Sequence, residues 1–161
     1  MDNTIIPDEF IIGIKELSID ASSMIYLLKT GLLGSLGAEI SLVTTKSVFN
    51  EVGWLKLPVK VIEIEYEGMT NDQSILLLAE KRWISILSED LEILQSAKQQ
   101  GLNYYNSLMM LNYLLLKGRI LPDEYPVYLD RIKEISHYSL NVLGYGEKIY
   151  KAVLRYLDNP V

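Results

Sequence analysis

Short β-type runs alternate with helical segments along most of this chain, and this alternation is the feature that most constrains its fold. Strands separated by helices are typical of βαβ units, in which the strands pair in parallel. The pattern therefore predicts an α/β fold of three layers, α/β/α, around a central, mainly parallel sheet of about five strands. The strands are expected at residues 16–19, 40–43, 59–64, 83–87 and 102–105.

Helical periodicity fills the segments between and after these strands. Thr70 and Gln73 have the spacing of a capping box, in which two side chains satisfy free N–H groups at a helix start. One domain is expected over residues 1–161, with 1–15 as an N-terminal extension, either an arm or an extra strand, and 121–161 as C-terminal helices. Helices are expected over 21–33, after Thr45, from 70 through 80, and over 91–100, 107–117, 122–141 and 147–158.

The size and composition of the chain exclude several classes of protein. Its 161 residues fit one domain, and the absence of cysteine excludes disulfides, zinc–thiolate sites and thiol catalysis. No apolar run reaches the roughly 18 residues that a membrane span needs. The first residues also lack the basic start of a secretory signal. A cytoplasmic protein without a membrane partner is therefore expected.

The charge of the chain limits how it could act on nucleic acid. Its formal net charge is −6, whereas proteins that bind nucleic acid through phosphate neutralisation are usually basic. Contact with nucleic acid would then need a local patch, a metal ion or a partner. Because His137 is the single histidine, multi-histidine metal sites are excluded and catalysis would fall to carboxylates.

Acidic residues follow two of the expected strands at their carboxyl ends, which is where open parallel sheets bind ligands. Asp20 ends the first strand and Asp90 follows the fourth. Asp72 begins the helix before the fourth strand, and Glu51 is expected to border the buried stripe of its own helix. Carboxylate oxygens are hard ligands that suit Mg²⁺ or Mn²⁺, so these acids are candidates for a divalent metal site.

Each of these acids also has an ordinary structural explanation. Asp20 and Asp90 could be helix N-caps, where aspartate is favoured. Asp72 could be a first-turn acid that complements the helix dipole, and Glu51 a half-exposed helix residue. Composition and spacing leave both explanations open.

The order of the acids resembles that of the PIN-like domain family. Ile19-Asp20-Ala21-Ser22-Ser23 is similar to the opening of PIN domains, a hydrophobic strand that ends in Asp before a small or hydroxyl pair. The second motif, a helix that presents a metal-proximal Glu, is matched by Thr45–Val52 with Glu51. Asp72–Ala79 and Ser88-Glu89-Asp90 resemble the third and fourth motifs, and segments 97–101, 106–111 and 117–120 resemble the tail of a prokaryotic branch, so that the resemblance spans 16–120.

The resemblance implies a metal-dependent endoribonuclease, often the toxin of a toxin–antitoxin pair. By motif match, the catalytic, metal-binding acids are Asp20, Glu51, Asp72 and Asp90, with Ser22 and Ser88 as supporting hydroxyls. Mg²⁺ or Mn²⁺ would hold the water that attacks phosphorus. RNA is then the expected substrate, an antitoxin protein a candidate partner, and a homodimer or other homo-oligomer the expected assembly.

Two other functions stay open. A non-catalytic PIN-like binding or regulatory module would keep the acidic pocket without chemistry. A receiver-type domain would bind Mg²⁺ around a phosphoacceptor, but it needs a paired acid after the first strand and a lysine after the last, and neither is evident.

The fourth motif, Ser88-Glu89-Asp90, departs from the Thr-x-Asp that is more usual in the PIN-like family. A nuclease requires all four acids to converge around one cleft, which a binding module does not.

Overall fold

The computed structural model describes residues 5–53 and 56–159 of the chain. The chain forms two compact units, and each is described by itself. The sheet unit comprises Lys15–Ser107, and the helical unit comprises the remaining described residues, 5–14 and 108–159. The expectation of one domain over residues 1–161 stays a prediction.

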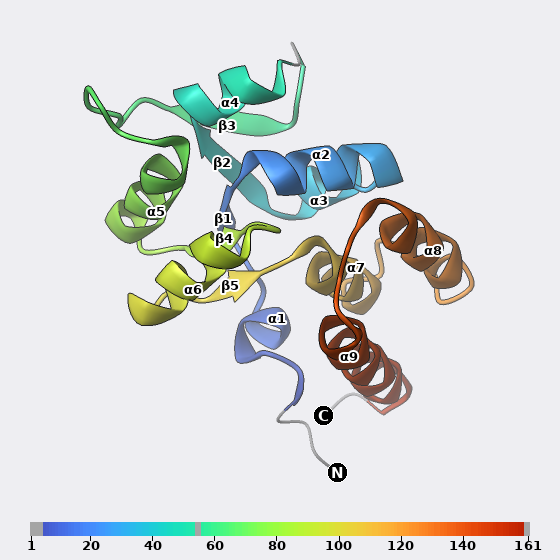
Figure 1. Ribbon diagram of the computed structural model, residues 1–161. Coiled ribbons are helices and arrows are strands. Elements are labelled where there is room, and N and C mark those ends of the chain that lie inside the picture. The colour runs from blue at the N-terminus through green and yellow to red at the C-terminus, as the bar shows by residue number, and fades with distance from the viewer. Residues whose placement is uncertain (1–4, 54–55, 160–161) are drawn as a thin grey trace. The chain divides into compact units, whose positions relative to one another are not determined.

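An all-parallel sheet lies at the centre of the sheet unit (Figure 1), and the described residues contribute five strands to it. The strand order is β3-β2-β1-β4-β5. The predicted α/β class, with three layers and a central parallel sheet, is confirmed. Receiver-type domains have the order 2-1-3-4-5, so the observed order does not fit that alternative. The strands are β1 (Glu16–Ile19), β2 (Ser41–Thr45), β3 (Val59–Ile62), β4 (Ser85–Leu87) and β5 (Tyr104–Tyr105).

Helices cover both faces of this sheet (Figure 1). From β1 the chain moves in one direction, to β2 and then β3, whereas the later crossovers lead back to β4 and on to β5. Because parallel crossovers are right-handed, the two directions place their helices on opposite faces. The first face carries α2 (Ala21–Thr30), α3 (Leu33–Glu39) and α4 (Lys46–Val52), and the second carries α5 (Asn71–Arg82) and α6 (Leu91–Gln99).

Strand β1 is the centre of the sheet and is buried on both faces. Leu17 and Ile19 are completely buried, as expected for a parallel strand between two helical layers. Ser18 is buried as well, and its hydroxyl donates a hydrogen bond to the carbonyl oxygen of Ile75 in α5 at 3.2 Å. The strand therefore holds the residue that follows it, Asp20, in a fixed place at the edge of the core.

The helical unit is built on α1 (Asp8–Ile12), the part of α7 (Ser107–Leu116) from Leu108 onward, α8 (Tyr125–Ile135) and α9 (Leu140–Asp158). The buried Asn112 side chain joins three of these helices. Its Nδ2 donates to the carbonyl oxygen of Gly146 at 3.2 Å, and its Oδ1 accepts from the Tyr125 hydroxyl at 2.8 Å. None of the helices within 5–53 and 56–159 combines the length and the apolar character that crossing a membrane would require.

Three helix predictions were wrong. The helix expected over 21–33 ends at Thr30, because Gly31 adopts a left-handed conformation with φ of 83°, and a separate helix α3 follows. The helix expected over 122–141 is two helices: Ser136 is extended, and Ser139 caps α9 by accepting the Val142 N–H at 3.2 Å. Gly144 and Gly146 consequently lie inside α9 instead of before it. The N-terminal extension contains a helix, α1, and no strand among its described residues.

Two glycines of α3 have opposite surroundings and give a matched test of packing in the sheet unit. A Cβ at Gly37 would lie 2.8 Å from the Cβ of Pro58, whereas a Cβ at Gly34 would meet nothing within 4 Å. Overpacking costs about 1–3 kcal/mol. Alanine in place of glycine within a helix gains about 1 kcal/mol.

We therefore expect Gly37→Ala to lower the free energy of unfolding by about 1 kcal/mol and Gly34→Ala to raise it by about the same amount. Urea denaturation of both variants and the wild type measures the difference. Two stabilised variants would contradict the close packing of α3 against Pro58.

Candidate acidic site at the carboxyl ends of the strands

Successive strands are added on one side of β1 as far as β3 and on its other side from β4 onward. The boundary between β1 and β4 is therefore the topological switch point of the fold. Crossovers on either side of such a point run along opposite faces and leave a crevice beyond the carboxyl ends of the strands. Ile19 pairs with Leu87 in the ladder, and the backbone N–H of Asp20 donates to the carbonyl oxygen of Leu87 at 2.9 Å. Asp20 and the turn that follows β4 therefore meet at this crevice.

Asp20 is the most buried acid of the predicted set, with 6% of its surface exposed. It occupies the N-cap position of α2, but its side chain does not accept the N–H groups of the second and third helical residues as a capping aspartate does, so ordinary capping does not account for it. Burial raises the pKa of Asp20 above its usual range. Hydrogen bonds from the Ala21 N–H and from two serines oppose this shift, and the negative charge of Glu51 adds to it.

Two serine hydroxyls hold Asp20 against the turn after β4. Ser88 and Ser22 donate to the same carboxylate oxygen, Oδ2, at 3.0 and 3.2 Å. The Ser88 hydroxyl oxygen also accepts the backbone N–H of Asp90 at 3.0 Å. The Ser22 oxygen accepts the backbone N–H of Glu89 at 3.1 Å. The turn and the buried carboxylate are therefore positioned together.

The other three predicted acids lie at the ends of neighbouring helices. Asp90 is an N-cap, because its Oδ1 accepts the N–H groups of Glu92 at 2.8 Å and Ile93 at 3.4 Å. Asp72 is an exposed residue in the first turn of α5, which begins with the predicted capping box. Glu51 is exposed as well, so the prediction that it borders the buried stripe was wrong.

Asn71 connects Glu51 to the start of α5. Its Nδ2 donates to Oε2 of Glu51 at 2.7 Å, which brings the end of α4 against the first turn that carries Asp72. Glu51 therefore reaches the site from the solvent side and not from the core.

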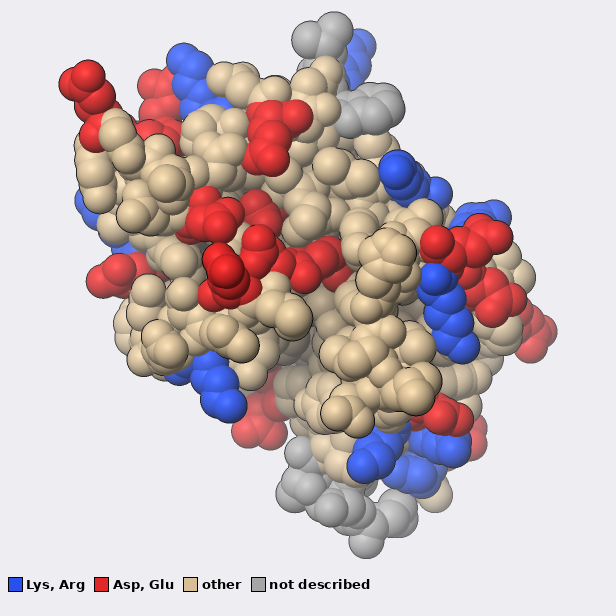
Figure 2. Space-filling model, in the orientation of Figure 1, with Lys and Arg blue, Asp and Glu red and all other residues tan. Residues whose placement is uncertain are grey.

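The charges of the four acids act on one another. Although Asp72 is largely exposed, partial loss of hydration is the first cause of its raised pKa, and the negative charges nearby raise it further. These charges are Asp90, Asp20, Glu92 and Glu51. Figure 2 shows acidic side chains gathered on one face of the sheet unit, in the region between α2, α5 and α6 of Figure 1. The structure thus brings the predicted acids into one neighbourhood.

The predicted acids do not form a preassembled metal-binding site in the described part of the chain. Within the described ranges, no three Asp, Glu or His side chains come close enough together to hold a metal ion as they stand. The chemistry of the donors nevertheless fits a hard divalent cation, because every acid here offers carboxylate oxygen. A cation would also relieve the repulsion that raises the pKa of Asp72.

Glu89 is the acid that the sequence analysis did not assign to the site. Its carboxylate accepts hydrogen bonds from the Ser23 hydroxyl, from the Ser107 N–H at 3.1 Å and from the Ser107 hydroxyl at 2.9 Å. It thereby ties α2 to the turn after β4 and to the last residue of the sheet unit. Its place between Ser88 and Asp90, directly after a buried strand, was the available signal.

No family model matches the chain, and no curated protein matches it either.

Proposed function

We propose that the sheet unit is a PIN-like, metal-dependent endoribonuclease that hydrolyses RNA phosphodiester bonds with Mg²⁺ or Mn²⁺. The observation that carries the proposal is the buried Asp20 carboxylate, held by two serine hydroxyls at the switch point among three further acids. A buried carboxylate beside other negative charges costs free energy unless a cation compensates it. Perturbed acids of this kind are concentrated at functional sites.

The predicted residues have two roles in this proposal. Asp20, Glu51, Asp72 and Asp90 would hold the metal ion, and Ser22 and Ser88 orient Asp20. The bound ion supplies a water of lowered pKa and a positive charge that neutralises the phosphodiester. Because burial raises the pKa of Asp20, this carboxyl retains a proton to a higher pH than an exposed aspartate, and it would have to lose that proton to hold a metal ion.

The proposal includes the identity of the partners. RNA is the substrate, and it is bound through the metal because the chain itself carries a net charge of −6. An antitoxin protein and a second copy of the chain are the proposed protein partners, in a cytoplasmic toxin–antitoxin setting.

A second candidate function is a non-catalytic PIN-like binding or regulatory module. The observation that favours it is the use of Oδ1 of Asp90 as a helix cap, together with the absence of a close three-residue metal group in the described ranges. Such a module would keep the acids for binding only.

The test is cleavage of a mixed pool of single-stranded RNA by the full chain in Mn²⁺, with an EDTA control and a matched DNA pool. We expect shorter RNA products that require Mn²⁺ and do not form in EDTA. Absence of cleavage together with absence of Mn²⁺ binding heat in calorimetry would contradict the proposal. Mn²⁺ binding without cleavage would instead support the non-catalytic module.

A further inference from the structure

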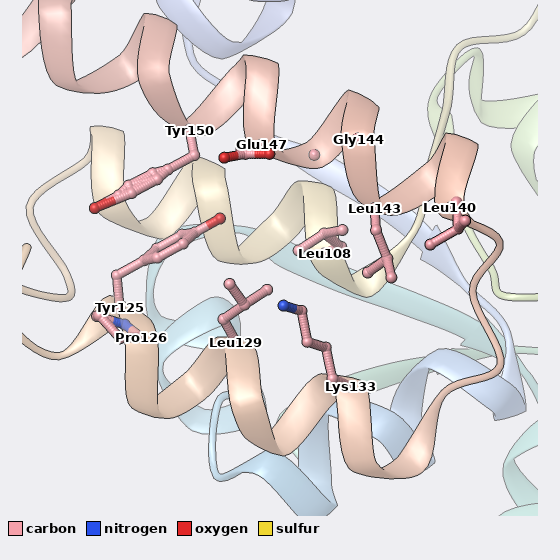
Figure 3. Close-up of a pocket in the computed structure, with 11 residues that line it drawn as sticks. Leu108, Tyr125, Pro126, Leu129, Lys133, Leu140, Leu143, Gly144, Glu147 and Tyr150 are labelled. Carbon is pink, nitrogen blue, oxygen red and sulfur yellow. The ribbon is translucent and has the colours of Figure 1, made fainter.

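A cavity of about 490 Å³ lies between α7, α8 and α9 of the helical unit (Figure 3). This volume falls in the range of small-molecule sites, about 300–1,000 Å³. Its walls are mainly apolar, with Leu108, Leu129 and Leu143 facing the space. The rings of Tyr125 and Tyr150 close one end, with their centroids 4.1 Å apart. The cavity therefore suits an apolar body.

The two glycines of α9 that line this cavity differ in what they contact. A Cβ at Gly146 would overlap Cδ2 of Leu108, so close packing against α7 accounts for that glycine. A Cβ at Gly144 would meet nothing within 4 Å. Glycine inside a helix is unfavourable relative to alanine, yet no packing contact requires it at position 144. Gly144 keeps part of the cavity open.

The cavity has one charged group without a partner. Figure 3 shows the Lys133 side chain extending from α8 with its Nζ directed into the space beside Leu129 and toward Leu108. Among the described residues, no carboxylate forms an ion pair with Lys133. Glu147 on the facing helix is paired with Lys151 at 3.4 Å, and the Tyr125 hydroxyl is committed to Asn112. Lys133 is exposed, so the cavity offers one solvent-accessible positive charge beside its apolar walls.

We propose that this cavity binds a small amphipathic carboxylate, with an apolar chain between the leucines and its carboxylate on Lys133. A nucleotide or a phosphate would call for several converging donors, which a single ammonium does not provide. An uncharged apolar molecule would leave the lysine unused. The proposal is independent of the acidic site, because every lining residue belongs to the helical unit.

Calorimetry of the full chain with decanoate tests the proposal, with octanoate and decan-1-ol as comparison probes. We expect decanoate to bind more tightly than octanoate by about fourfold for each added methylene. Gly144→Leu fills the open space and should abolish binding of both decanoate and decan-1-ol. Lys133→Met should weaken decanoate about threefold to fivefold and leave decan-1-ol unchanged, as expected for loss of one exposed charge pair.

Lys148→Met is the matched control, because Lys148 is a cation of α9 that does not line the cavity. It should bind decanoate as the wild type does. Circular dichroism establishes that each variant is folded. No binding of decanoate by the wild type at millimolar concentration would overturn the proposal. Undiminished binding by folded Gly144→Leu, or equal effects of Lys133→Met and Lys148→Met, would also overturn it.

Discussion

Asp20→Asn should lower metal-dependent RNA cleavage by at least about a hundredfold, the scale on which removal of one electrostatic group acts in an active site. Asparagine keeps the shape of the side chain and can still accept hydrogen bonds from Ser22 and Ser88. It removes the negative charge that the proposed metal ion needs. Single-turnover cleavage of one RNA substrate in Mn²⁺ measures the loss.

Glu16→Gln is the control for this variant, because it removes one negative charge from the opposite end of the same strand. Glu16 is bound by Arg82 through two hydrogen bonds of 2.7 Å, away from the carboxyl ends of the strands. Cleavage by Glu16→Gln should match the wild type. Wild-type cleavage rates in Asp20→Asn would exclude Asp20 from the reaction.

The same Asp20→Asn variant should be more stable than the wild type when no metal is present, by about 1 kcal/mol at neutral pH. Because burial raises the pKa of Asp20, the folded protein binds this proton more tightly than the unfolded chain does. The stabilisation from that proton is complete below the unfolded pKa of about 3.9 and is lost as pH rises through the folded pKa. The advantage of the variant should therefore grow with rising pH.

Urea denaturation in EDTA, carried from about pH 4 to neutrality, measures this pH dependence. The relevant quantity is the free energy of unfolding of the variant minus that of the wild type. A difference that shrinks as pH rises would show that the Asp20 charge does not strain the metal-free fold.

Mn²⁺ should stabilise the wild-type protein by about 2.7 kcal/mol at a concentration one hundred times its dissociation constant. For a chain of this size, that corresponds to a rise in melting temperature of about 5–10 °C. The physical reason is that the ion binds the folded arrangement of acids and neutralises the charges that raise the pKa of Asp72. Thermal unfolding followed by circular dichroism, with and without Mn²⁺, measures the gain.

Asp72→Asn should reduce this gain, because it removes one of the proposed ligands. Glu16→Gln should lower the starting stability by loss of the Arg82 contact but keep the full gain from Mn²⁺. Sodium chloride at matched ionic strength controls for general screening of charge. A gain that sodium chloride reproduces, or that Glu16→Gln loses as Asp72→Asn does, would argue against a metal site at these acids.

Local patterns in the sequence predicted where the five strands lie along the chain, although β3, β4 and β5 are shorter than expected. The buried run of β1 and the capping box at Thr70 and Gln73 depend on side chains a few positions apart, and both were predicted correctly. The order of the acids along the chain likewise indicated which of them follow the carboxyl ends of strands. The two turns at Gly31 and at 136–139 were missed, because apolar periodicity continues across them.

Only the tertiary structure decided which of these residues meet. The β3-β2-β1-β4-β5 order is a long-range property, and it places Asp20 and the turn after β4 at one switch point. The same aspartate residue type then acts as a cap at position 90 and as a buried, serine-held carboxylate at position 20. Glu89, Gly144 and Lys133 likewise acquire their surroundings from distant segments, because pairing and packing, unlike helix propensity, are set by residues far apart in the chain.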